Sequence, residues 1–280
     1  MVKALQSPFK MILATRLLVL ATLAQGLEPS LEPILWLPLG DSITLGCGSL
    51  EKPRDRDYAH CSPFAAGYRV PLAYALTQQG FDVSTMGTQT NGPAAWVSPQ
   101  WLHHEGHPGL TIANLLTNGQ LNKSFAHPSA NGKLPGLITV HMGTNDCAVR
   151  FKHGRHGPLT RNYPPQIAKE AEKLLAVLYE RAPKARVFIA SLIHFPKEHD
   201  CVAGYNALLP KVVADHRSRG MQVFYVPLSE SVKLCASNST DEEPRMSGLC
   251  LRDETHPTAA GYLHIAGAFA LAIAEAFSGS

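Results

Sequence analysis

The sequence predicts an α/β fold in which helices cover both faces of a parallel sheet. Apolar, β-branched runs alternate along the chain with segments of helical spacing, and Gly, Asn and Asp cluster just after the runs. Alternation of this kind is typical of strand–helix–strand units, which form parallel sheets. No linker or repeat divides the 280 residues, so we expect one domain over residues 27–280, preceded by a targeting segment over residues 1–26.

The elements of this fold can be named in order. The expected strands are short apolar runs: Ile34–Leu39, Phe81–Met86, Leu137–Met142, Val187–Ile193 and Val223–Val226. The expected helices are longer segments with helical spacing: Arg69–Gln79, Pro165–Arg181, Ala203–Arg219 and Thr258–Phe277. In open α/β sheets, ligands bind at the rim where the carboxyl ends of the strands meet. Residues that directly follow the strands are therefore the first candidates for a functional site.

Residues 1–26 have the layout of a secretory signal peptide. Lys3 and Lys10 precede the apolar stretch Met11–Ala24, and small residues follow up to Gly26. This order is typical of a cleaved signal, and the apolar stretch is shorter than the roughly 20 residues that a membrane crossing needs. We expect a secreted, extracellular protein; an uncleaved anchor or a buried helix are the alternatives.

Without residues 1–26 the chain is electrically balanced. That segment contains three of the 25 Lys and Arg residues and no acidic residue, which leaves 22 basic and 22 acidic residues. A protein without net charge lacks the basic surface that nucleic acid or an anionic membrane attracts. We therefore expect no nucleic-acid partner, no membrane insertion after cleavage, and a monomer.

The six cysteines all follow the signal segment, and an even number in a secreted chain indicates disulfides. Their spacing contains no Cys-X-X-Cys pair, which argues against a zinc site. Several pairings remain open; we favour Cys47–Cys61, Cys147–Cys201 and Cys235–Cys250. Asn122 and Asn238 begin Asn-X-Ser/Thr sequences, so the chain is a candidate glycoprotein if its host is eukaryotic.

Several residues that follow strands or precede the last helix are expected to lie at one rim of the predicted sheet. Ser42 follows the first strand, Gly87 the second and Asn145 the third, and Asp253 and His256 precede the last helix. Taken singly, each has another explanation: Gly87 as a strand terminator, and the others as helix-cap or turn residues. Their convergence on one rim favours an active site over those separate explanations.

The residue types at this rim fit acyl transfer. Serine needs an adjacent base to become a nucleophile, and the base needs a partner that orients it. We predict Ser42 as the nucleophile, His256 as the base and Asp253 as the group that orients its imidazole. The oxyanion of the tetrahedral intermediate needs donors fixed in advance. Candidates are the backbone N–H groups of Ser42 and Gly87 and the side-chain amide of Asn145.

These residues form blocks that resemble those of the SGNH (GDSL-type) hydrolase superfamily. The blocks are Gly40-Asp41-Ser42, Gly87, Gly143-Thr144-Asn145-Asp146 and Asp253-X-X-His256, in the family's order over most of the mature chain. The resemblance implies a three-layer α/β/α sandwich around a five-stranded parallel sheet. It also implies the same catalytic and oxyanion roles for the five residues named above.

A narrower resemblance points to one branch of that superfamily. Gly67-Tyr68-Arg69 and the run His104–Gly109 are similar to carbohydrate esterase family 3, whose members are largely acetyl xylan esterases. The chain departs from that pattern by its extra cysteines and by an insertion between Lys52 and His60. Both departures bear on the substrate.

The histidine-rich run 103–107 also suggests a metal site, but its spacing does not fit one. The HExxH metalloprotease motif needs two residues between the Glu and the second His, on a helix, and here there is one. We expect no metal and no cofactor. We expect a loop that lines the substrate cleft, with Asp41, Glu105 and His107 contacting substrate, and we interpret His141 as a core or rim histidine.

The sequence therefore predicts a secreted serine esterase that removes short acyl groups, acetyl above all, from carbohydrate. Its expected partner is an acetylated polysaccharide or another small acyl ester. One alternative is a lipid-directed esterase or lysophospholipase of the same superfamily. Another is a catalytically inactive carbohydrate-binding protein on the same scaffold.

Overall fold

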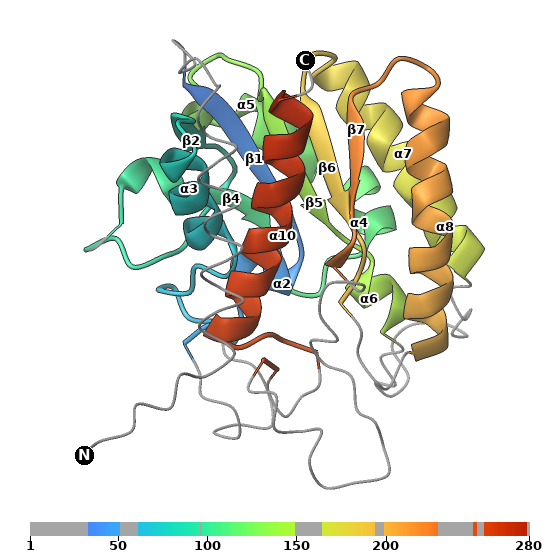
Figure 1. The fold of residues 1–280 in the computed structure, drawn as a ribbon, viewed down its shortest axis with the longest axis horizontal. Helices are drawn as coiled ribbons and strands as arrows, with labels where there is room; N and C mark the ends of the chain where they lie inside the picture. The colour runs from blue at the N-terminus through green and yellow to red at the C-terminus, as the bar shows by residue number, and fades with distance from the viewer. Residues whose placement is uncertain are drawn as a thin grey trace, which may run out of the picture.

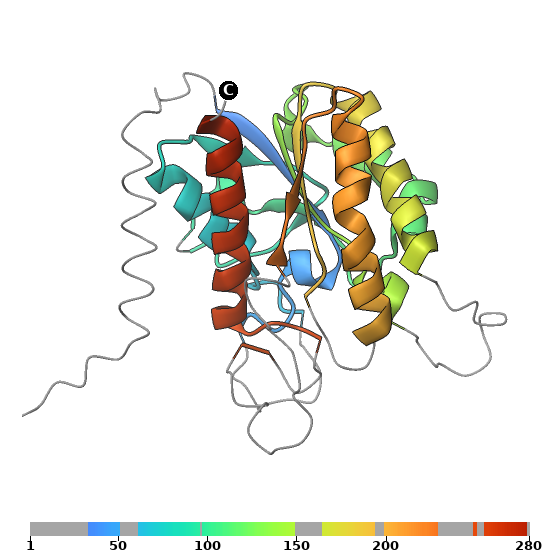
Figure 2. The same ribbon diagram turned by 45° about the vertical axis from the view of Figure 1, so that its right-hand side comes forward.

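The computed structural model describes residues 33–50, 61–95, 97–148, 164–193, 199–228, 249–250 and 255–278. The predictions for the signal segment 1–26, Cys235, Asn238 and Asp253 lie outside these residues. Within them the chain forms the predicted α/β fold, with helices on both faces of one central sheet (Figures 1 and 2).

The sheet of the described residues has seven strands in the order β3-β4-β1-β5-β6-β7, with β2 also paired to β1. Their bounds are Ile34–Gly40 (β1), Val83–Thr85 (β2), Gln89–Thr90 (β3), His103–Gly106 (β4), Leu137–His141 (β5), Arg186–Ala190 (β6) and Val223–Val226 (β7). All pairs are parallel except β3 with β4. The five predicted strands are all present, and β3 and β4 are additional.

Strands β2 and β4 share one side of β1, each along half of its length. β2 pairs with the first half, where Trp36 is opposite Thr85, and β4 pairs with the end, where Gly40 is opposite Gly106. The strand that reaches the rim beside β1 is therefore β4. Gly87 instead packs against His104, two residues before the end of β4. The sequence predicted Gly87 at the rim beside Ser42; because β2 ends after Thr85, the structure places it beside β4 instead.

Two helical layers enclose the sheet, as Figure 2 shows. On one face lie α3 (Arg69–Gln78) and α10 (Ala259–Ser278), and on the other lie α7 (Pro164–Arg181) and α8 (His199–Arg217). Shorter elements fill the connections: α2 (Ser42–Leu45), α4 (Ile112–Thr117), α5 (Gln120–Ala126), α6 (Thr144–Cys147), and the 3₁₀ helices η2 (Pro99–Trp101) and η3 (Pro128–Ala130). Both α2 and α6 follow the carboxyl ends of their strands and lie at the same end of the sheet (Figure 1).

One hydrophobic core cluster includes residues of both helical layers and of the sheet, and it buries one face of α10. Among the described helices, α10 is the one long and apolar enough to cross a membrane by length and composition. Its buried residues recur every three or four positions and include Tyr262, Phe269 and Ile273. Tyr68 of the segment before α3 stacks on Phe269 with ring centroids 5.1 Å apart. In this structure α10 is thus a core helix packed on the sheet and α3.

Two of the predicted disulfides are confirmed. Cys47 is bonded to Cys61, and Cys147 is bonded to Cys201. The second bond links α6, at the rim of the sheet, to α8. Cys250 is also disulfide-bonded, and its predicted partner lies outside the described residues.

Candidate active site

Ser42 is the first residue of α2, directly after the buried strand β1. Asp41 caps this helix, because its Oδ1 accepts a hydrogen bond from the Ile43 N–H at 2.9 Å. The helix ends after four residues at Gly46, whose φ of 105° lies in the left-handed region. Asp41 is therefore a helix cap, and the helix that it caps places Ser42 at the carboxyl rim of the sheet.

His256 meets Ser42 across 214 positions of sequence. Its Nε2 lies 2.8 Å from Ser42 Oγ, which is hydrogen-bond distance. At the start of α10, the Gly261 N–H donates to Thr258 Oγ1 at 3.4 Å, so Thr258 serves as a cap just after the histidine. A serine hydroxyl bonded to an imidazole nitrogen is the arrangement that lets the imidazole take the hydroxyl proton. The predicted orienting residue, Asp253, lies outside the described residues.

Asn145 also lies at this rim. It is in α6, which begins after Gly143 at the end of β5, and its Nδ2 donates to the Leu110 carbonyl at 3.1 Å. An amide nitrogen carries a second N–H, for which the described residues supply no acceptor. Asn145 is therefore held in place by one N–H and has another that can bind an oxyanion.

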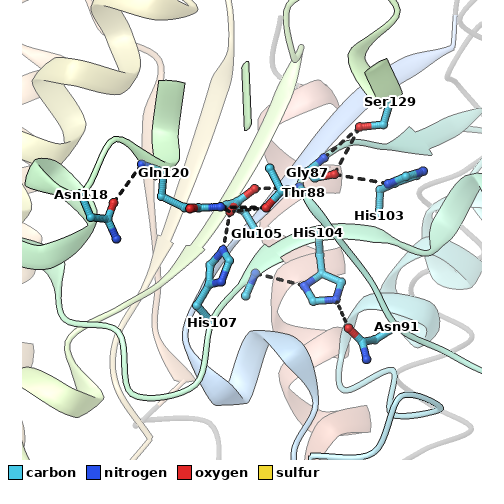
Figure 3. A network of polar contacts seen from close by, with 11 residues as sticks. Gly87, Thr88, Asn91, His103, His104, Glu105, His107, Asn118, Gln120 and Ser129 are labelled. Carbon is cyan, nitrogen blue, oxygen red and sulfur yellow. Dashed lines mark hydrogen bonds and ion pairs between the residues drawn. The ribbon is translucent and has the colours of Figure 1, made fainter. Parts of the chain in front are cut away.

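Gly87 does not have a comparable N–H. Its amide donates to Ser129 Oγ at 3.2 Å, and its carbonyl lies 3.3 Å from His103 Nδ1 (Figure 3). A Cβ at this position would lie 2.2 Å from the His104 carbonyl carbon, and φ is 139°. Glycine is needed here because β4 passes so close. The register of β2 against β1 places Gly87 away from the end of β1, so its position gives no support for an oxyanion role.

The turn after β4, residues 107–110, occupies the place predicted for Gly87. The His107 N–H donates to the carbonyl of Gly40 at 3.1 Å, and the Leu110 N–H donates to the carbonyl of His107 at 3.2 Å. Pro108 has no N–H, and no acceptor for the Gly109 N–H is found among the described residues. Gly109, with a φ of 77°, thus has a backbone N–H that is available to an oxyanion and that the sequence did not predict as a donor. The sequence feature that could have identified it is the Pro108-Gly109 turn directly after the polar strand β4.

The three predicted substrate contacts fall into two groups. Asp41 and Glu105 have no exposed surface, so the prediction that they touch substrate is not supported. Burial raises the pKa of Asp41. Burial also raises the pKa of Glu105, but hydrogen bonds from His107, Thr88 and Gln120 outweigh it and leave that pKa below its usual value. Only His107 has a partly exposed side chain, at 22%.

Behind the rim lies a buried polar group beside Asp41. His141, at the end of β5, is completely buried, and neither of its ring nitrogens has a hydrogen-bond partner among the described residues. Burial lowers the pKa of His141, which favours the neutral ring. Its position behind Asp41 rather than at the surface agrees with a core histidine. The described residues contain no group of three or more metal-ligating side chains.

Comparison with known proteins gives both a family and a fold. The family described as GDSL-like lipase/acylhydrolase matches residues 37–269. A family 3 carbohydrate esterase from Clostridium thermocellum is 24% identical and superposes with a TM-score of 0.59, covering 88% of this chain and 100% of its own. A family 3 carbohydrate esterase from Talaromyces cellulolyticus is 17% identical, with a TM-score of 0.61 and coverages of 86% and 97%. Axe2, an acetylxylan esterase from Geobacillus stearothermophilus, is 15% identical, with a TM-score of 0.53 and coverages of 86% and 94%. No curated protein matches the sequence.

Proposed function

Because the chain belongs to the family of GDSL-like lipases and acylhydrolases, we propose that it is a serine esterase that removes acetyl groups from carbohydrate. The observation that carries this proposal is the 2.8 Å contact between Ser42 Oγ and His256 Nε2 at the carboxyl end of β1. The names of the solved structures with this fold, family 3 carbohydrate esterase and acetylxylan esterase, support acetylated carbohydrate as the substrate class.

The proposed reaction proceeds through an acyl-enzyme. Ser42 Oγ attacks the ester carbonyl carbon while His256 Nε2 takes the hydroxyl proton, and His256 then returns that proton to the leaving sugar hydroxyl. In the second half, water that gives a proton to His256 attacks the acyl carbon; the bond to Ser42 Oγ then breaks, acetate leaves and His256 returns the proton to Ser42 Oγ. Asp253 is proposed to orient the imidazole during both steps.

Three donors are proposed to hold the oxyanion that forms in each half-reaction. Ser42 is the first residue of α2, and the first N–H groups of a helix have no intrahelical acceptor. The Gly109 N–H and the second N–H of Asn145 complete the set. Donors fixed before the reaction stabilise developing charge without reorganisation, and the loss of one costs on the order of 10²- to 10³-fold in kcat.

Secretion is part of the proposal. Disulfides persist in oxidising compartments outside the cytosol, and the Cys47–Cys61 and Cys147–Cys201 bonds support such a location. A polysaccharide substrate is also found outside the cell. Residues 1–26 are the proposed targeting signal.

The test measures acetate release from a panel of acetylated polysaccharides and compares p-nitrophenyl acetate with p-nitrophenyl octanoate. We expect the acetyl substrates to be preferred and Ser42→Ala to abolish turnover. Activity of Ser42→Ala at the wild-type rate would overturn the assignment of the nucleophile. Preference for octanoate would instead indicate a lipid-directed esterase, and polysaccharide binding without acetate release would indicate a binding protein.

A further inference from the structure

Glu105 is a buried carboxylate, one residue before the end of β4, that is surrounded by donors. Its Oε1 accepts from Thr88 Oγ1 at 2.9 Å, from Gln120 Nε2 at 2.7 Å and from His107 Nε2. Its Oε2 accepts from the Thr88 N–H at 2.9 Å. Figure 3 shows these groups converging on the carboxylate from the β2–β3 connection, the start of α5 and the turn after β4. Because Glu105 has no exposed surface, any effect on substrate must pass through a partner.

Thr88 and Gln120 hold the carboxylate itself in place. They come from separate elements and together donate three hydrogen bonds to its two oxygens. Hydrogen bonds to an ionised acceptor are roughly twice as strong as neutral ones. The carboxylate is therefore a fixed point inside the fold, against which a fourth donor can be positioned.

His107 is that fourth donor, and it is attached at three points. Its N–H donates to the Gly40 carbonyl, its own carbonyl accepts from the Leu110 N–H, and its ring bonds to Glu105. An ionised carboxylate only accepts hydrogen bonds, so the proton of the ring contact belongs to His107 Nε2. The contact thus sets both the tautomer and the orientation of the imidazole.

We propose that Glu105 and His107 form a positioning pair for the turn 107–110. The proposal rests on the esterase function above, in which this turn supplies the Gly109 N–H to the oxyanion. The buried carboxylate holds the His107 ring, the ring holds the turn, and the Leu110 carbonyl of the same turn holds Asn145. Two of the three proposed oxyanion donors would then depend in part on the hydrogen bond between Glu105 and His107. A misplacement of about 1 Å in such a site can cost about 100-fold in rate.

The competing explanation is that His107 binds substrate through its exposed edge. The two explanations differ in kinetics, because loss of uniform substrate binding raises KM, whereas loss of transition-state donors lowers kcat. They also differ in what can replace the ring. A glutamine at position 107 keeps an N–H donor for Glu105, while an alanine keeps none.

The experiment measures kcat and KM of the full chain with p-nitrophenyl acetate. We expect His107→Ala to lower kcat by about 100-fold with KM unchanged within about twofold. His107→Gln should retain kcat within a few-fold of wild type. His103→Ala is the matched control. It removes a nearby histidine whose ring contacts the Gly87 carbonyl and not Glu105. The kcat of this variant should equal that of wild type.

A second comparison tests whether the two residues act together. Glu105→Gln should lower kcat as His107→Ala does, and the double variant should be no slower than the slower single variant, because both remove one interaction. If thermal unfolding shows that Glu105→Gln does not fold, the comparison of His107→Ala, His107→Gln and His103→Ala is sufficient to test the proposal.

Two results would overturn the positioning pair. One is a His107→Gln variant as slow as His107→Ala, and the other is a rise in KM with kcat unchanged. Failure of the esterase proposal looks different: Ser42→Ala would then be as active as wild type, whatever the position-107 variants do.

Discussion

Replacing Asp146 by asparagine should change how stability depends on pH. Asp146 is 7% exposed, and both of its carboxylate oxygens lie within hydrogen-bond distance of the Ile112 N–H, at 3.2 and 3.1 Å. Burial, more than any other factor, raises its pKa from 3.8 to about 6. A raised carboxyl pKa means that the folded protein binds the proton more tightly than the unfolded chain does. The stability that this group contributes is therefore complete below pH 3.8 and is lost as the pH rises through about 6.

The size of the effect follows from the difference between the two pKa values. About two pKa units correspond to about 3 kcal/mol, of which roughly 2 kcal/mol should be lost between pH 4 and pH 7. The asparagine side chain does not titrate, so the stability of Asp146→Asn relative to wild type should improve by that amount over this interval. Urea unfolding of both proteins at the two pH values measures it. An equal difference in unfolding free energy between the two proteins at pH 4 and at pH 7 would contradict a raised pKa of Asp146.

Two further predictions concern stability. Cys147–Cys201 joins residues 54 apart and Cys47–Cys61 joins residues 14 apart, which in the chain-entropy model correspond to about 4 and about 3 kcal/mol. Replacing the first pair by serine should therefore lower the urea midpoint more than replacing the second, and the reverse order would contradict this. Arg69 is completely buried and donates to five backbone carbonyls, each costly to leave unpaired at about 1 kcal/mol or more. Arg69→Met should thus lose more than about 4 kcal/mol, and a loss below about 1 kcal/mol would disprove it.

The sequence predicted the sheet well where the strands are apolar. β1, β5, β6 and β7 are mostly apolar runs of aliphatic and aromatic residues, so their hydrophobicity alone identifies them. It missed β4, because His103–Gly106 is polar and its burial depends on partners far away in sequence. Glu105 and His104 are buried only because Thr88, Gln120 and Asn91 supply hydrogen bonds.

The early end of β2 and the unpredicted strand β4 together explain the position of Gly87. Ser42 and Asn145 follow strands that hydrophobicity identifies, and the structure brings both to the rim. Gly87 follows β2, which ends halfway along β1. Whether Gly87 reaches the rim depends on where β2 ends, and the sequence of a three-residue strand contains little information about its end. His256 was predicted because a serine nucleophile needs a base and this histidine precedes the last helix; its contact with Ser42 is present.

The proposed esterase function depends most on Ser42 being a nucleophile activated by His256. Intact-protein mass spectrometry after treatment with phenylmethanesulfonyl fluoride tests this directly, because that reagent sulfonylates activated serines. We expect a single adduct that peptide mapping assigns to Ser42, and its loss in His256→Ala. An adduct on another residue, or labelling of His256→Ala at the wild-type rate, would contradict it.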